Sequence, residues 1–296
     1  MRKLIILLAL LSMFQGPSLA TAASSLPDDL LLQPALITLN NQAGSSGTGF
    51  FVHWTDGHLY LVTAKHVFLT MDKATGEYKL RSDKATVLCY PREQHFKDAL
   101  RFHLDLPKLY REQKLRSHPS RDIIVVRFTQ GDSINHPNEA KKRRMIDGVQ
   151  QAADSGEGTI NAFPPNALLP FEQTAVSNDV YIFGYPNSLG IKNVPQIEYE
   201  KPLLRKGIVA GKNYQLKTLI LDCPSFYGNS GGPVVQVESV SFGVNEFRLI
   251  GVVSQFIPFE DGWINLRHGL KNTQLENSGY SVVMPTDNVV ELLKSF

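Results

Sequence analysis

The stretch Gly228-Asn-Ser-Gly-Gly-Pro233, centred on Ser230, decides the fold prediction for this chain. Glycines on both sides of a serine allow backbone conformations that other residues avoid, so the hydroxyl and nearby amides can face one point. A serine hydroxyl reacts poorly until a base takes its proton, and an acid must orient that base. The turn therefore predicts a histidine and an acid elsewhere in the chain. A plain glycine turn is the simpler interpretation, but it gives no reason for the serine.

Both partners lie upstream of the serine. The run Tyr60-Leu-Val-Thr-Ala-Lys-His66 is typical of an apolar strand that ends in a histidine, and Asp122 opens a β-branched run. We therefore expect His66 to act as the base and Asp122 to fix the tautomer of its imidazole. Asp105 is a second acid in the same interval, but Leu and Pro follow it, so we expect it to cap a loop. Histidines without a preceding apolar strand are interpreted as surface or core residues: His53, His58, His103 and His118.

The order histidine, aspartate, serine is that of the chymotrypsin-like double barrel, whereas α/β-hydrolases run serine, acid, histidine. The chain resembles the trypsin-like serine proteases, and within them the protease domain of the bacterial HtrA group, over most of residues 43–296. Four further segments carry the resemblance in the same order: Gly47-Thr-Gly-Phe-Phe-Val52, Phe183-Gly-Tyr-Pro186, Lys206-Gly-Ile-Val-Ala210 and Val283-Met-Pro-Thr-Asp287. Two departures are expected from the family pattern, namely the lack of a PDZ-type segment and long insertions after His66 and Asp122.

The fold that the resemblance implies is all-β, with two antiparallel six-stranded β-barrels and a short C-terminal helix. Many short β-rich runs without alternating helices favour the same architecture over a parallel sheet. We expect one protease domain over residues 24–296, with the first barrel at about 35–130 and the second at about 175–285. Asp287 is the candidate N-cap of the last helix.

The resemblance also implies an oxyanion hole and a pocket formed without cleavage of a precursor. The amides of Gly228 and Ser230 would converge on the oxygen of the tetrahedral intermediate. Asn229 occupies the position where digestive proteases carry an aspartate that pairs with a new N-terminus. The pocket should therefore form without cleavage of a precursor.

Substrate binding is assigned by the same resemblance to Pro224 and to Ser254, Gln255 and Phe256. Pro224 would lie at the base of the primary specificity pocket, and it carries no charge to match an arginine or lysine of the substrate. The strand 254–256 would pair with the substrate backbone. The ring of Phe256 either narrows the pocket or packs outward. We expect small or medium apolar side chains to be preferred.

The first residues have the order of a secretory signal peptide: the charged Met1-Arg-Lys3, an apolar run 4–14, and small residues through Ala23. We predict a signal peptide at 1–23 and a periplasmic or extracellular mature chain, with no stable membrane insertion after cleavage; an uncleaved anchor is the alternative. The formal charge of +2 comes from Arg2 and Lys3. A near-neutral mature chain gives no reason to expect nucleic acid or an anionic membrane as the main partner. The basic run 141–144 is interpreted as a solvated loop.

Two cysteines, Cys89 and Cys223, allow a single intramolecular bridge in an oxidising compartment. We expect them in different barrels, where bridging distance is not reached, and therefore as buried thiols. Neither lies in a cluster of Cys and His residues, so the prediction contains no metal site and no cofactor.

These patterns together predict an exported serine endopeptidase that acts on polypeptides through an acyl-enzyme. A catalytically silent trypsin-like fold that serves as a binding module is the alternative from another class. A lipase elbow with Asp261 and His268 as partners of Ser230 is a third interpretation, but it would need crossover helices that the β-rich runs do not provide.

Overall fold

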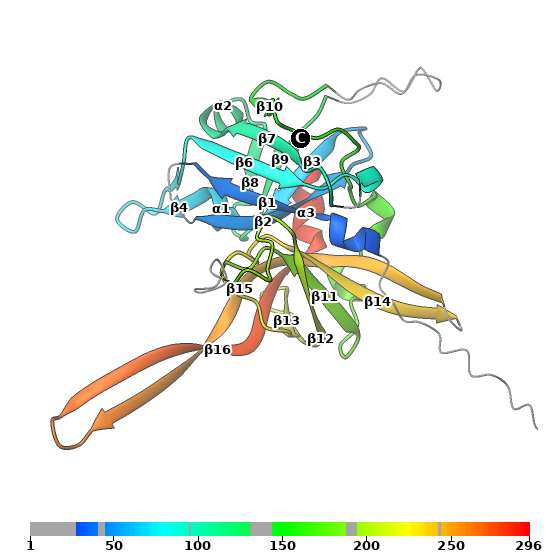
Figure 1. Ribbon diagram of the computed structural model, residues 1–296. Helices are drawn as coiled ribbons and strands as arrows, with labels where there is room; N and C mark the ends of the chain where they lie inside the picture. The colour runs from blue at the N-terminus through cyan, green and yellow to red at the C-terminus, as the bar shows by residue number, and fades with distance from the viewer. Residues whose placement is uncertain (1–27, 41–44, 95, 131–143, 188–193, 242–243) are drawn as a thin grey trace, which may run out of the picture.

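The computed structural model of the chain describes residues 28–40, 45–94, 96–130, 144–187, 194–241 and 244–296. The predicted signal peptide and the basic residues 141–143 lie outside the described residues. Strands dominate the rest, and helices are short (Figure 1). The predicted all-β, chymotrypsin-like class is confirmed.

The first unit is an antiparallel sheet of eight strands in the order β10-β7-β6-β1-β2-β3-β9-β8. Its strands are β1 (Pro34–Leu39), β2 (Ser46–His53), β3 (Leu59–Thr63), β6 (Lys84–Cys89), β7 (Leu100–Asp105), β8 (Leu115–Ser117), β9 (Ile124–Arg127) and β10 (Val149–Gln151). The predicted number of six strands is therefore corrected to eight for this unit. The first unit extends beyond residue 130, its predicted end, because β10 pairs with β7 and so belongs to this sheet.

Short elements decorate the first sheet. They are the 3-10 turns η1 (Asp28–Leu32) and η2 (Arg92–Gln94), the helices α1 (Lys65–Phe68) and α2 (Leu106–Arg111), and the hairpin of β4 (Leu69–Met71) and β5 (Tyr78–Leu80). Asp105 is the N-cap of α2, since its side chain accepts a hydrogen bond from the Lys108 amide at 3.0 Å. Asp105 is thus a capping residue, as expected, but it caps a helix and not the predicted loop.

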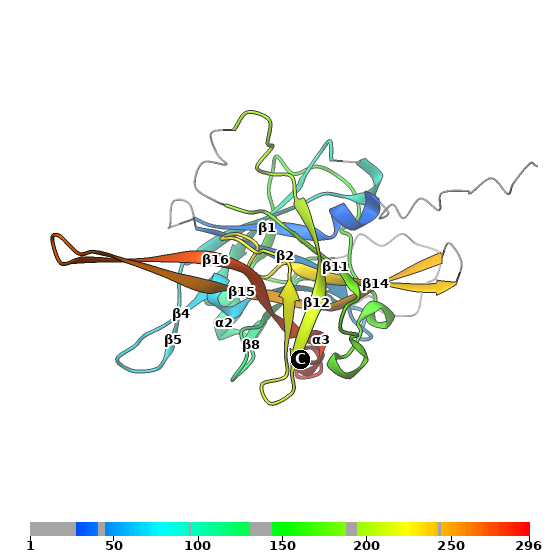
Figure 2. The ribbon, with the colours of Figure 1, turned by 90° about the horizontal axis from the view of Figure 1, so that it is seen from below.

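The second unit is a closed barrel of six strands in the order β11-β12-β13-β16-β15-β14, as predicted. Its elements are β11 (Asp179–Gly184), β12 (Leu203–Asn213), β13 (Thr218–Asp222), β14 (Pro233–Ser241), β15 (Val244–Asn265) and β16 (Leu270–Pro285), preceded by the turns η3 (Pro165–Ala167) and η4 (Phe171–Gln173). β15 and β16 continue past the barrel as a two-stranded arm that extends far from the body (Figures 1 and 2).

The strand that precedes the candidate histidine is buried on both faces, which explains its unbroken apolar sequence. All of β3 is buried. Leu59 and Leu61 point into the core of the first unit, whereas Tyr60 and Val62 point into a second core that also contains Phe183 of the other unit. Side chains alternate along a strand, so β3 can serve both cores at once. Packing in both cores fixes the position of the C-terminal end of β3 relative to the second barrel.

Helix α3 (Thr286–Leu293) closes the same core between the units with Val289, Leu292 and Leu293. The prediction of Asp287 as N-cap is wrong by two positions, because Pro285 is the cap residue. The Asp287 carboxylate instead accepts a hydrogen bond from the Phe171 amide at 2.7 Å. It ties the helix to the turn η4.

Candidate active site

His66 is brought to the surface by a single helical turn. β3 ends at Thr63, and α1 then buries Lys65 and Val67 while the side chain of His66 stays 47% exposed. The Thr63 hydroxyl donates to the Thr48 carbonyl at 2.7 Å, which fixes the end of the strand. The imidazole is therefore presented to solvent from a rigid support.

Asp122 precedes β9 and holds His66 at two points. One carboxylate oxygen accepts from the His66 amide at 3.0 Å, and the other accepts from His66 Nδ1 at 2.8 Å. Because Nδ1 donates to this carboxylate, Nε2 is the nitrogen left to accept a proton. The pair thus has the tautomer that a general base requires.

Ser254 is a further partner of Asp122 that the sequence did not reveal in this role. Its hydroxyl donates to Asp122 Oδ2 at 2.6 Å. Burial raises the pKa of Asp122, but hydrogen bonds from His66 and Ser254 and the His66 charge outweigh it, so the pKa lies below its ordinary value. The carboxylate stays charged beside the imidazole.

Ser230 lies in the glycine-rich turn that joins β13 to β14 in the second unit, and this turn contacts the first unit. The backbone of Gly231 has a φ of +86°, and a Cβ there would collide with Thr63 Oγ1 and the Thr48 carbonyl. The Ser230 hydroxyl donates to the Ser254 carbonyl at 3.4 Å. Among the described residues no hydrogen bond joins this hydroxyl to His66, so it must turn from Ser254 to reach the imidazole.

The peptides around Gly228 are held by three contacts. The Asn187 amide donates to the Tyr227 carbonyl, and Thr48 Oγ1 donates to the Gly228 carbonyl at 2.6 Å. In a trans peptide the N–H points opposite to its carbonyl, so the Gly228 N–H is directed away from Asn187. Asn229 Oδ1 accepts from the Phe226 amide at 3.0 Å. Within the described residues neither Gly228 nor Ser230 donates its amide to a backbone carbonyl, so both amides remain candidates for the predicted oxyanion hole.

Thr48 is the second residue whose role the sequence did not reveal. It is fully buried, donates to the Gly228 carbonyl and accepts from the Tyr185 amide at 3.1 Å. The only signal was its place between two glycines in a motif that carried the family resemblance.

One cleft of about 1120 Å³ brings the candidate residues together. It is lined by His66, Asp122, Gly228, Ser230, Ser254, Gln255 and Phe256. Pro224 does not line the cleft, whereas its neighbours Ser225 and Phe226 do. The ring of Phe256 packs edge-on against Tyr227, with 5.8 Å between centroids, at the wall of the cleft. The uncharged character expected of the pocket thus rests on Phe226 and Phe256 rather than on Pro224.

The side of the cleft formed by the first unit carries positive charge. Lys65, Arg81 and Arg121 line it together with Asp122. Burial lowers the pKa of Lys65, although the charge of Asp122 acts in the opposite direction. The ammonium of Lys65 lies 4.5 Å from the centre of the Tyr78 ring. A substrate with basic side chains would meet repulsion here.

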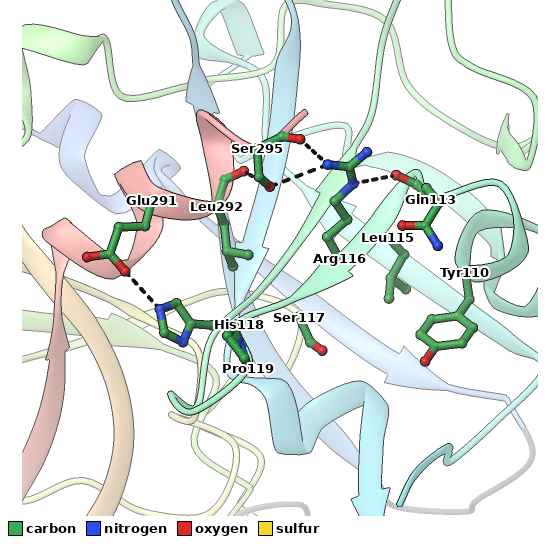
Figure 3. A pocket seen from close by; sticks show the side chains of 10 residues that line it. All are labelled: Tyr110, Gln113, Leu115, Arg116, Ser117, His118, Pro119, Glu291, Leu292 and Ser295. Atoms are coloured by element: carbon green, nitrogen blue, oxygen red, sulfur yellow. Dashed lines mark hydrogen bonds and ion pairs between the residues drawn. The ribbon is translucent and has the colours of Figure 1, made fainter.

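His118 supports the loop that leads to Asp122. It lines a separate hollow of about 440 Å³ between α3 and residues 110–119 (Figure 3). The amides of Ser120 and Arg121 donate to its Nδ1 at 3.2 and 3.0 Å, so Nε2 carries the proton and donates to Glu291 at 2.9 Å. His118 therefore has a structural role.

The remaining candidates lie away from the cleft. Asp261 is in the arm and His268 in its terminal turn, and neither lines the cleft of Ser230. Cys89 and Cys223 are free and belong to different cores, as expected. Burial raises their pKa to about 12 and about 11. In the described part of the chain no group of His, Cys, Asp and Glu could hold a metal, and no helix is long and apolar enough to cross a membrane.

The family follows from comparison with known proteins. The model of the trypsin-like peptidase domain matches residues 47–244, which is more than half of the chain. The chain belongs to this family of peptidases. No curated protein matches it.

The solved structures similar to this chain include three of HtrA-type protease AlgW. The match to a variant with a tripeptide has a TM-score of 0.47 at 16% identity. It covers 90% of this chain and 60% of the variant's chain. AlgW with a tripeptide has a TM-score of 0.46 at 16% identity, with coverages of 89% and 59%. AlgW with a decapeptide has a TM-score of 0.42 at 17% identity, with coverages of 84% and 50%. The chain thus spans less than two thirds of the length of these proteins.

Proposed function

We propose that this chain is an exported serine endopeptidase in which Ser230 is the nucleophile, His66 the general base and Asp122 the acid that orients it. The observation that carries the proposal is the cleft, where the bonded Asp122–His66 pair and Ser230 meet from three distant segments. Membership of the peptidase family supports the same reaction class.

The first half of the reaction forms the acyl-enzyme. Ser230 Oγ attacks the carbonyl carbon of the scissile peptide while its proton passes to His66 Nε2, and the C=O π electrons move to the oxygen. The amides of Gly228 and Ser230 donate to that oxygen. When the intermediate collapses, the C–N bond breaks and the leaving amine takes the proton from His66.

The second half repeats these steps with water. His66 accepts a proton from water as its oxygen attacks the acyl carbon, and returns it to Ser230 Oγ when the ester bond breaks. Asp122, held charged by Ser254 and His66, stabilises the imidazolium in both halves. His66 passes on each proton that it accepts, so the proposed steps need no metal or cofactor.

The proposed substrates are extended polypeptides. Residues Ser254, Gln255 and Phe256 line the cleft on strand β15, whose edge can pair with a substrate backbone. Phe226 and Phe256 offer an uncharged wall, and the cations on the opposite side disfavour arginine and lysine before the scissile bond. Apolar residues are therefore the proposed preference at that position.

The proposed location is the periplasm or the extracellular space. It rests on the charged, apolar and small-residue order of residues 1–23. N-terminal sequencing of the secreted chain should find a start near Ser24, and a chain that retains Met1 would contradict export by cleavage.

A serine-directed fluorophosphonate tests the reaction. The mature chain should be labelled at Ser230 alone, and Ser230→Ala should abolish labelling and peptide hydrolysis while its thermal unfolding stays unchanged. Ser120→Ala, a matched change at another serine of the cleft, should retain both activities. Absence of labelling in a folded wild-type chain would instead favour the binding-module alternative.

A further inference from the structure

The arm formed by β15 and β16, residues 258–277, is the part of the molecule that the proposed reaction does not use. Its pairing runs from Pro258 opposite Asn277 to Asn265 opposite Leu270. Figures 1 and 2 show it as the orange ribbon that leaves the barrel and ends far from the body. A two-stranded ribbon alone in water is marginally stable, so an arm of this length calls for a function.

Exposed apolar side chains lie along the arm, including Phe259 and Leu275 nearer the barrel, and four of them lie at its end. Leu266 is 93% exposed, and Trp263, Ile264 and Leu270 are each more than half exposed. Scattered single apolar residues are normal on a surface, but a cluster that includes a tryptophan at the extremity of an arm marks a contact site. We call residues 263–271 the tip.

Charge is segregated along the arm. The tip contains Arg267 and Lys271 and no Asp or Glu, whereas the acids Glu260, Asp261 and Glu276 lie on the shaft nearer the barrel. The near-neutral balance of the whole chain conceals this arrangement. Within the arm, the tip is the part that is both apolar and cationic.

The terminal turn holds the tip in one shape. The Asn265 carbonyl accepts from the amides of His268 and Gly269, and the Asn265 side chain accepts from the Arg267 amide at 3.0 Å. Gly269 takes the positive φ of +66° that closes the turn. Leu266 is thereby presented at the extremity without the entropic cost of ordering a loose loop.

The register shows which medium can cover the tip. Residues two apart on a strand share a face, and so do residues directly opposite each other on paired strands. Trp263 shares a face with Asn265, and Asn265 is opposite Leu270, so Trp263 and Leu270 lie on one face of the ribbon. Ile264 and Lys271 share the other face. A flat protein surface would cover one face only, whereas a fluid lipid layer surrounds both.

We propose that the tip docks reversibly on an anionic lipid surface. Trp263, Ile264, Leu266 and Leu270 enter the boundary between headgroups and acyl chains, where tryptophan is favoured. Arg267 and Lys271 lie at the level of the lipid phosphates and pair with them. The acidic shaft is repelled by the same surface, which limits insertion to the tip.

Docking would set the distance between the cleft and the membrane. β15 carries Phe256 at the cleft and Asn265 at the tip, a reach of roughly 30 Å at the usual rise of a strand. The site that we propose to be catalytic would then work on polypeptide segments that extend from the lipid surface.

Vesicle flotation with the mature chain tests the docking and needs no catalysis, so it is performed with the Ser230→Ala variant. The protein should float with vesicles of phosphatidylglycerol and phosphatidylcholine, and much less with phosphatidylcholine alone. Leu266→Ser should lower the partition coefficient at least about tenfold. Arg267→Gln with Lys271→Gln should lower it roughly 30-fold on the anionic vesicles only. Leu216→Ser makes the same substitution at a leucine that lies outside the arm and is 54% exposed; it is the control and should bind like the parent.

Fluorescence provides a second readout on the tip itself. The chain has two tryptophans, so Trp54→Phe leaves Trp263 as the single reporter. Its emission should shift to shorter wavelength on adding anionic vesicles. The proposal is overturned if the parent does not float, or if Leu266→Ser and Leu216→Ser bind equally. It is also overturned if the tip instead mediates lipid-free self-association that Leu266→Ser abolishes.

Discussion

Replacement of Thr48 by valine is the sharpest test of how the candidate oxyanion hole is held. Valine keeps the shape of threonine but removes the hydroxyl that donates to the Gly228 carbonyl at 2.6 Å and accepts from the Tyr185 amide at 3.1 Å. Thr48 is fully buried, so water cannot replace either hydrogen bond. We expect the peptide between Gly228 and Asn229 to lose its fixed orientation.

The magnitude follows from the two groups left unsatisfied. Each buried backbone group without a partner costs about 1 to 3 kcal/mol, and partial rearrangement recovers some of this. A net cost of about 2 to 4 kcal/mol that falls on the geometry of the hole predicts an acylation rate lower by roughly 30-fold to 10³-fold. Loss of a single oxyanion donor in other enzymes costs about 10² to 10³.

The assay is the second-order rate of fluorophosphonate labelling, with thermal unfolding measured in parallel. Thr48→Ser keeps the hydroxyl and loses only a methyl group, so it should label within about fivefold of the wild type. If Thr48→Val labels as fast as Thr48→Ser, the Gly228 carbonyl contact has no part in the hole, and the reasoning fails.

Three further predictions concern the acid, the pocket and the thiols. Asp122→Asn should lower kcat by about 10⁴ because the imidazole loses its tautomer. The lowered pKa of Asp122 stabilises the native state above the ordinary carboxyl range, so the stability gap between wild type and variant in urea should shrink as pH falls below about 4; a constant gap would contradict the pKa direction. Phe256→Gly should widen cleavage toward aromatic residues in a peptide library, whereas a strict Arg or Lys profile in the wild type would mean that the pocket is misassigned. Cys89 and Cys223 should resist a thiol reagent until unfolding, and rapid modification of the native chain would refute their burial.

The strands and the reactive turn could be predicted because their signals are local. The unbroken apolar run of β3, the β-branched run of β9 and the glycines around Ser230 each indicate the local backbone conformation. The predicted residues His66, Asp122 and Ser230 do line one cleft, while their catalytic roles remain predictions. The strand count of the first unit could not be predicted, because β8 and β10 are short edge strands whose pairing depends on distant partners.

The sequence by itself determined the all-β class and the order of the candidate residues, since each follows from residue type and spacing along the chain, and by the same kind of pattern it predicts the leader. The tertiary structure alone decided that Ser254 donates to Asp122, that Thr48 holds the Gly228 carbonyl, and that Pro224 does not line the cleft. It also decided that β15 and β16 leave the barrel as an arm. The two hydrogen bonds join residues far apart in the chain, so they arise from the packing of the two units against each other, which no local pattern records.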